Sequence, residues 1–307
     1  MKAKTISSAV ILVTLAVFMA VPASAGPIPS SLVPEGARWI VHLDMEKFVG
    51  TSLYGYLEKE DAFRIKSRDI DRWLKMDIAR DVKSLTVFGL GPGDNDIVFA
   101  VSGKLDKAGI VAMVEADKDH QAAAYGAYTL YSSGSDEHSA FVNDSLIVFS
   151  EGREAIEKVL DTAGGKVKNF AGTVLSASLK EVPAGAFLSG TLPDLSGLGK
   201  ELGQSKVLDQ ASGLFFLAQE KAGSLHIRLQ VTAASDESAK NMANVVQGFM
   251  ALARMGGDEG DMARVAGLID GLKVQQDGKV LRLDFERPSK EIADLISHSR
   301  GFSGFLD

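Results

Sequence analysis

The chain has 307 residues, no cysteine and a formal net charge of −7. Without cysteine it has no disulfide, no thiolate metal site and no thiol nucleophile. An acidic balance opposes non-specific binding to nucleic acid, because that binding depends on neutralising phosphates, and it equally opposes attachment to anionic lipid. The length allows one large or two modest domains with a sizeable core.

The first 25 residues have the layout of a secretory signal peptide. Two lysines near the start precede an apolar run from Ala9 to Val21, and Ala23-Ser24-Ala25 forms a small-residue cleavage site. The apolar run is short of the roughly 20 residues that a spanning helix needs. We expect cleavage between Ala25 and Gly26, a periplasmic or secreted protein, and no transmembrane segment in the mature chain. An uncleaved N-terminal anchor is the alternative.

A short phrase occurs twice in the rest of the chain. Val33 to Ala37 reads VPEGA, and Val182 to Ala186 reads VPAGA. Each phrase precedes an apolar run typical of a strand, and the elements that follow repeat in the order β-α-β-β-α-β-β-α. We therefore predict two sequence-related repeats, at residues 26–165 and 182–307, joined by a connector at 166–181. Two unrelated α+β domains are the alternative.

Periodicity predicts the elements of the first half. Alternation from Ala37 to Asp44 indicates a strand, and the helical spacing that follows indicates two amphipathic helices, one through residues 48–57 and one through residues 63–74. Further along we expect a hairpin at 85–88 and 97–101, a helix capped by Asp106, strands at 125–131 and 139–149, and a helix from Arg153 to Thr162. Asp136-Glu137-His138 reads as a polar turn between two strands.

The second half repeats this order. We expect a strand at 186–192, a helix from Asp194, a hairpin at 214–218 and 225–231, a long helix from Ser235, a further helix from Asp261, strands on both sides of Asp277-Gly278, and a final helix after Pro288. Strands joined mostly by hairpins favour an α+β fold with a mainly antiparallel sheet and helices on one face.

The opening of the mature chain resembles a group of uncharacterised secreted bacterial proteins with two α+β repeats. The residues that carry this resemblance are Pro34, Ala37, Val41 and Asp44, in a strand that follows a proline and a small residue and ends near an aspartate. The resemblance implies the duplicated fold and export. It implies no catalytic residues.

His42, Asp44 and Glu46 are the candidate metal ligands. If a strand continued to Glu46, alternation would place all three side chains on one face, where an imidazole and two carboxylates suit a divalent metal. The alternative is that the strand ends at Asp44 and that Asp44 caps a helix beginning at Met45. The second half has no such triplet.

Other motifs favour loops over chemistry. The glycines from Gly89 to Gly93 do not form G-x-G-x-x-G and lead into a strand, so we expect a hairpin loop there. The acidic runs at 94–96 and 258–261 lack EF-hand spacing, and Asn143-Asp144-Ser145 reads as a turn. The tail at 301–307, with two phenylalanines, is expected to pack, to be disordered or to act as a short recognition peptide.

No motif for nucleophilic hydrolysis is present in the sequence. We therefore expect a protein without catalytic residues or cofactor, which binds a protein or small molecule through its sheet face or between its halves. The alternative is a hydrolase or metal-dependent enzyme whose site forms only in three dimensions. A third class is an assembly factor that binds clients through an exposed apolar patch.

Overall fold

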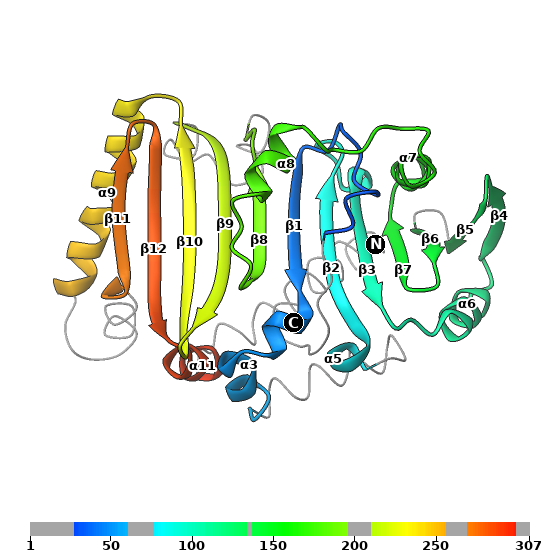
Figure 1. The fold of residues 1–307 in the computed structure, drawn as a ribbon, viewed down its shortest axis with the longest axis horizontal. Helices are drawn as coiled ribbons and strands as arrows, with labels where there is room; N and C mark the ends of the chain where they lie inside the picture. The colour runs from blue at the N-terminus through cyan, green and yellow to red at the C-terminus, as the bar shows by residue number, and fades with distance from the viewer. Residues whose placement is uncertain (1–27, 61–76, 134–136, 196–209, 256–268, 299–307) are drawn as a thin grey trace.

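The computed structural model describes residues 28–60, 77–133, 137–195, 210–255 and 269–298 (Figure 1). Its strands form one twelve-stranded sheet, in the order β11-β12-β10-β9-β8-β1-β2-β3-β7-β6-β5-β4, and neighbouring strands pair antiparallel. The α+β class with an antiparallel sheet is therefore confirmed.

The strands of the first half are β1 (Trp39–Asp44), β2 (Val82–Gly89), β3 (Ile97–Gly103), β4 (Gln121–Tyr125), β5 (Tyr128–Ser133), β6 (Glu137–Asn143) and β7 (Leu146–Ser150). Those of the second half are β8 (Ala186–Leu192), β9 (Ala211–Lys221), β10 (Ser224–Ala233), β11 (Leu272–Asp277) and β12 (Val280–Pro288). The α-helices are α2 (Met45–Val49), α3 (Ser52–Leu57), α5 (Ile78–Asp81), α6 (Lys107–Glu115), α7 (Arg153–Ala163), α8 (Val174–Leu179), α9 (Asp236–Met255) and α11 (Ser289–His298).

The two halves of the chain share this sheet, because β1 and β8 pair antiparallel at its centre. His42 on β1 lies opposite Ser189 on β8, and both side chains are buried. The predicted connector includes α8, whose Leu175 is buried in the core. The first strand of each half thus forms the seam between them.

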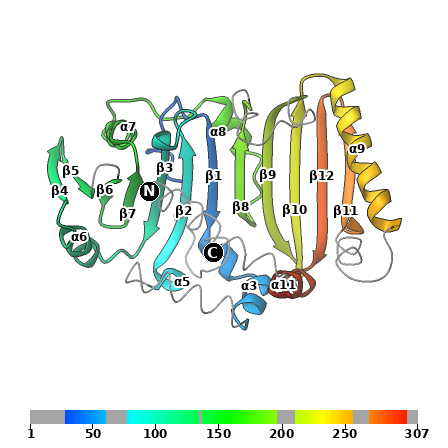
Figure 2. The same cartoon turned by 180° about the vertical axis from the view of Figure 1, so that it is seen from behind.

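Helices cover both faces of the sheet, which Figures 1 and 2 show from opposite sides. One face carries α2, α3 and α11 around a cluster that includes Leu43, Phe48 and Ile292, and α9 packs on the same face over β10, β11 and β12. The other face carries α7 and α8 around a cluster that includes Ile40 and Val159. We call these the α9 face and the α7 face.

The prediction of helices on one face is therefore wrong. The central strands are apolar on both sides: in β1, Ile40 points to the α7 face, while Leu43 points to the α9 face, and both are buried. A strand of this kind needs a layer on each side, because a solvated face would expose apolar side chains to water.

Residues 121–150 form four strands, where two were predicted. Gly126 has a φ of +60° in the turn between β4 and β5, a conformation that glycine adopts without strain. Asn143 starts the turn between β6 and β7, and its side chain accepts a hydrogen bond of 2.9 Å from the Ser145 amide. That turn was predicted. Glu137 and His138, expected in a turn, lie in β6.

The strand order of the two halves agrees, but their closing helices do not. Outward from the seam, the first half reads β1-β2-β3-β7-β6 and the second reads β8-β9-β10-β12-β11. The helices that follow β7 and β12 are α7 and α11, and they pack on opposite faces. Five strands of each half therefore follow the same order, whereas β4 and β5 have no counterpart among the described strands of the second half and the closing helices lie on opposite faces.

Several predicted elements of the second half are confirmed. Asp277 and Val280 pair across the β11–β12 hairpin, whose turn contains Gly278 at a φ of +53°. The long helix from Ser235 is α9, and the final helix is α11.

Other predictions fall outside the described residues. They are the signal peptide, the helices expected at 63–74, after Asp194 and from Asp261, the acidic run at 258–261 and the tail at 301–307. Among the helices that the structure describes, none has the length and apolar character to cross a membrane.

Candidate functional site

The predicted metal ligands do not share one strand. β1 ends at Asp44, and α2 begins at Met45. One oxygen of Asp44 accepts a hydrogen bond of 3.1 Å from the Lys47 amide, and the other lies 2.8 Å from the Lys47 ammonium. Glu46 is exposed in the first turn of α2. Asp44 is therefore a helix cap, which was the alternative interpretation of the triplet.

His42 lies in a buried polar row across the centre of the sheet. Its Nδ1 is 2.8 Å from the hydroxyl of Thr86, the residue opposite it on β2. Among the described residues no three His, Cys, Asp or Glu side chains are placed to hold a metal ion. The arrangement satisfies a buried imidazole and leaves the metal hypothesis without its ligands.

The glycine loop before β3 is a hairpin connection, as predicted. Gly89 at the end of β2 pairs with Ile97 at the start of β3. A 3₁₀ turn, η1 (Asp94–Asp96), lies in the loop between them. Asp96 accepts a hydrogen bond of 3.2 Å from the Gly93 amide. This carboxylate of the acidic run thus stabilises its own turn.

A serine–histidine pair lies near the β4 edge of the sheet. The hydroxyl of Ser132 on β5 is 2.8 Å from Nδ1 of His138 on β6. The nearby Asp117 accepts hydrogen bonds from the hydroxyl of Ser133 and from the Asp119 amide, and these bonds hold the pKa of Asp117 below its ordinary value. Asp117 is thus engaged by other groups.

The α7 face is polar over β9, β10, β12 and β11. Of the described helices, α8 packs on β8 on this face, whereas α9 and α11 pack on the α9 face of the other strands. Strand pairing aligns the α7-face residues in rows: Gln219, His226 and Glu286 form one row, and Leu217, Arg228, Asp284 and Lys273 form the next. Four strands of this half thus place charged and amide side chains side by side.

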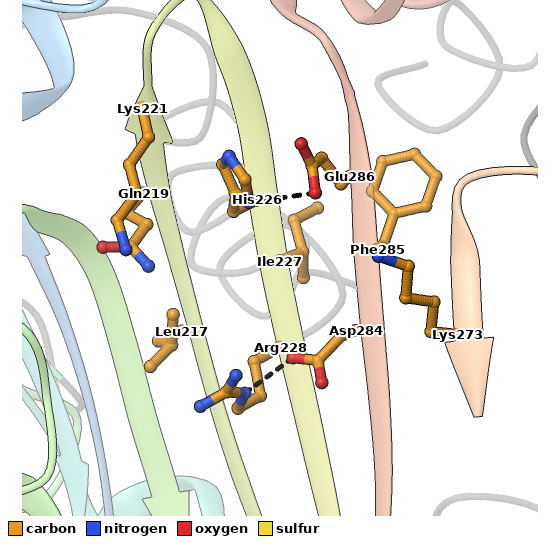
Figure 3. Close-up of a pocket in the computed structure, with 10 residues that line it drawn as sticks. All are labelled: Leu217, Gln219, Lys221, His226, Ile227, Arg228, Lys273, Asp284, Phe285 and Glu286. Atoms are coloured by element: carbon orange, nitrogen blue, oxygen red, sulfur yellow. Dashed lines mark hydrogen bonds and ion pairs between the residues drawn. The ribbon is translucent and has the colours of Figure 1, made fainter. Parts of the chain in front are cut away.

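These rows surround a hollow of about 130 Å³, shown in Figure 3. Its floor on β9 is well packed, with Leu217 only 3% and Gln219 only 8% exposed. Two polar contacts cross it from β10 to β12. Arg228 forms an ion pair with Asp284, with Nε 2.6 Å from Oδ1, and His226 Nδ1 lies 3.7 Å from Glu286 Oε2. The hollow is therefore a built surface with fixed side chains at its centre.

The charges around the hollow are not balanced. Lys221, Arg228 and Lys273 are cationic, whereas Asp284 and Glu286 are acidic, which leaves one positive charge with His226 neutral. No carboxylate of the described residues lies within 4 Å of the ammonium of Lys221 or Lys273. The hollow is thus locally cationic in a chain of net charge −7.

Two buried polar atoms on this face have no hydrogen-bond partner among the described residues: Oε1 of Gln219 and Nε of Arg282. Gln219 borders the hollow, and Arg282 lies one row beyond Asp284 on β12. A buried polar atom without a partner costs on the order of 1–3 kcal/mol, so proteins rarely retain one without a reason. Both atoms lie on the polar face around the hollow.

This polar face was not predicted, although the alternation of apolar and polar residues in β10 indicates it. In β10, Leu225, Ile227 and Leu229 alternate with the polar side chains of His226, Arg228 and Gln230. A strand with one apolar and one polar face is typical of a sheet covered on one side. The pattern therefore indicated a polar face, although it did not indicate which strands would meet there.

No protein-family model matches the sequence, and no curated protein matches it. Among solved structures, three crystal forms of a protein called TP0453 have a similar fold, with TM-scores of 0.51 for form III and 0.50 for forms I and IV. Each is 10% identical in sequence, and each comparison covers 89% of this chain and 97–99% of the other. This likeness establishes the fold alone.

Proposed function

We propose that this protein is an exported, non-enzymatic binding protein, and that its ligand occupies the polar α7 face over β9, β10 and β12. The observation that carries the proposal is the hollow itself, which combines a buried floor, the Arg228–Asp284 ion pair and two lysines that no described carboxylate approaches within 4 Å. Binding sites are typically concave surfaces with a few convergent polar groups.

Export rests on the signal-peptide layout of residues 1–25, and we propose a periplasmic or secreted location. We also propose that the halves arose by duplication. The matching strand orders on the two sides of the seam support it. The opposite placement of α7 and α11 limits it to the strands, and any specialised function then lies where the halves differ.

A ligand screen tests the proposed function. We would measure thermal unfolding with saturating series of sugars, amino acids, carboxylates, phosphates and polyamines, because a ligand present at about 100 times its Kd stabilises by roughly 2.7 kcal/mol. His226→Trp would fill the hollow from its centre, and Gln247→Trp on exposed α9 is the matched control. We expect at least one class to stabilise the wild type and the control but not His226→Trp. If no class does so, the proposal is wrong.

A hydrolase is the second candidate function, and the hydrogen bond between Ser132 and His138 is the observation that favours it. A serine beside a histidine is the minimum for nucleophilic hydrolysis. Hydrolysis of p-nitrophenyl acetate by the wild type, abolished in Ser132→Ala, would support this function. Equal rates for both proteins would exclude this pair as its site.

A further inference from the structure

We infer that the hollow on the α7 face binds a carboxylate group of its ligand, held end-on by the guanidinium of Arg228. The inference rests on the proposed function and specifies the ligand class of the same site. It follows from the orientation of Arg228, the charge balance of the hollow and the placement of the neighbouring side chains.

Arg228 is already oriented for such a contact. Its Nε donates to Asp284 at 2.6 Å, which fixes the plane of the guanidinium. In Figure 3 its two terminal nitrogens lie on the β9 side, away from Asp284. Neither terminal nitrogen has a hydrogen-bond partner among the described residues. Two parallel N–H groups in one plane match the two oxygens of a carboxylate.

The space next to these nitrogens suits the rest of an organic acid. Leu217 lies opposite Arg228 in the ladder and provides an apolar floor for a short carbon chain. Gln219 and Lys221 continue along β9 on the same face, so an amide and an ammonium border the same space (Figure 3). The hollow therefore places the guanidinium of Arg228, an apolar surface and further polar groups next to one another.

The charge of the hollow favours a carboxylate over a phosphate. Its three cations and two acidic side chains leave an excess of one positive charge, which a single carboxylate neutralises. A phosphate dianion would bring a second negative charge close to Asp284 and Glu286, and like charges in a partly buried site repel. The shared chemistry is a carboxylate, from either a free small acid or a peptide C-terminus.

Isothermal titration calorimetry tests the inference directly. Butyrate represents a free small acid and N-acetylglycine a peptide C-terminus, and each is compared with its uncharged amide and with inorganic phosphate. The proteins are the wild type, Arg228→Lys, Arg228→Gln and the matched control Arg254→Gln. Arg254 is a suitable control because its Nε also bonds a carboxylate, that of Asp270 at 3.3 Å, but on α9.

We expect at least one of the two acids to bind saturably, and its amide not to bind. Arg228→Lys retains the charge but lacks the fork, so it should weaken binding roughly tenfold or more, whereas Arg254→Gln should change it less than twofold. Any of three results would overturn the inference. The amides bind as well as the acids, phosphate binds more tightly than both acids, or the Arg228 variants bind as the wild type does. Circular dichroism confirms that each variant folds.

The failure of this inference differs from the failure of the proposed function. If neutral or cationic molecules bind in the ligand screen and His226→Trp blocks them, the hollow is a binding site and the carboxylate assignment is wrong. If no class in the screen depends on the hollow, the proposed function itself is wrong.

Discussion

The carboxylate of Glu220 accepts a hydrogen bond of 2.6 Å from the hydroxyl of Ser289, at the start of α11. The same carboxylate accepts hydrogen bonds from the hydroxyl and amide of Ser52, both at 2.8 Å, and from the Leu53 amide at 2.9 Å, at the start of α3. One side chain at the end of β9 thus joins the N-termini of two helices from opposite halves of the chain. Helix N-termini carry unpaired amides and favour negative charge.

Removing this charge should destabilise the fold. We expect Glu220→Gln to lower the free energy of unfolding by roughly 1–3 kcal/mol, because the amide cannot accept all four hydrogen bonds. Urea unfolding measures the change. Glu286→Gln is the control, since Glu286 is about half exposed, and should change the stability by less than about 0.5 kcal/mol. Equal effects of the two substitutions would contradict the account.

The same carboxylate predicts a pH dependence. Burial alone would raise the pKa of Glu220, but the hydrogen bonds from Ser289, Ser52 and Leu53 outweigh it and lower the pKa below its ordinary value. The stabilisation is therefore complete above the unfolded pKa of about 4.3 and is lost as the pH falls through the lower folded pKa. The difference between wild type and Glu220→Gln should be constant near neutral pH and should shrink below about pH 4. A constant difference down to pH 3 would exclude this mechanism.

Asp44 provides a test of the helix cap against the metal site. Asp44→Ala should cost about 1 kcal/mol, because the Lys47 amide loses its acceptor, whereas Asp44→Asn should retain most of the stability. Neither EDTA nor added Zn²⁺ should change the unfolding temperature of the wild type. A stabilisation by Zn²⁺ that Asp44→Asn abolished would restore the metal hypothesis.

Alanine substitutions at two neighbouring residues of α9 should differ strongly in their effect on stability. Met250 is 8% exposed and packs against the sheet, so Met250→Ala should cost about 2–3 kcal/mol. Phe249 is 64% exposed and should tolerate alanine within about 0.5 kcal/mol. Chemical unfolding of both variants measures the difference. A large loss for Phe249→Ala would show that its ring is covered in solution.

Two glycines form another matched pair. A Cβ at Gly190 on β8 would collide with the ring of Phe216, so Gly190→Ala should cost roughly 1–3 kcal/mol. A Cβ at Gly55 in α3 meets no atom within 4 Å, so Gly55→Ala should stabilise by about 0.5–1 kcal/mol through helix propensity. Urea unfolding measures the change in the free energy of unfolding for each variant. Changes of opposite sign support the close packing of Gly190 against Phe216, and changes of the same sign would contradict it.

Local patterns predicted the local elements. The Asp277-Gly278 turn and the long helix after Ser235 each depend on signals within a few residues, and both are confirmed. The number of strands between Gln121 and Ser150 was wrong because the run at 125–131 contains the turn at Gly126, and because the run at 139–149 was counted as one strand although a turn was expected at Asn143.

Long-range arrangement could not be predicted in the same way. Arg228 and Asp284 meet only because β10 and β12 pair, although β11 lies between them in sequence. The pairing of β1 with β8 likewise joins strands more than a hundred residues apart. Alternation indicated a polar face on β10, but the register that aligns the rows depends on the whole sheet.

The most direct test of the central claim is the NMR signal of the Arg228 Nε–H group during titration with butyrate, N-acetylglycine and their amides. Arg228→Lys identifies the signal by its absence. The account predicts a saturable shift of this signal with at least one acid and none with its amide, together with shifts of the Leu217 and Gln219 amides. An unmoved Arg228 signal, with shifts confined to other parts of the sheet, would contradict it.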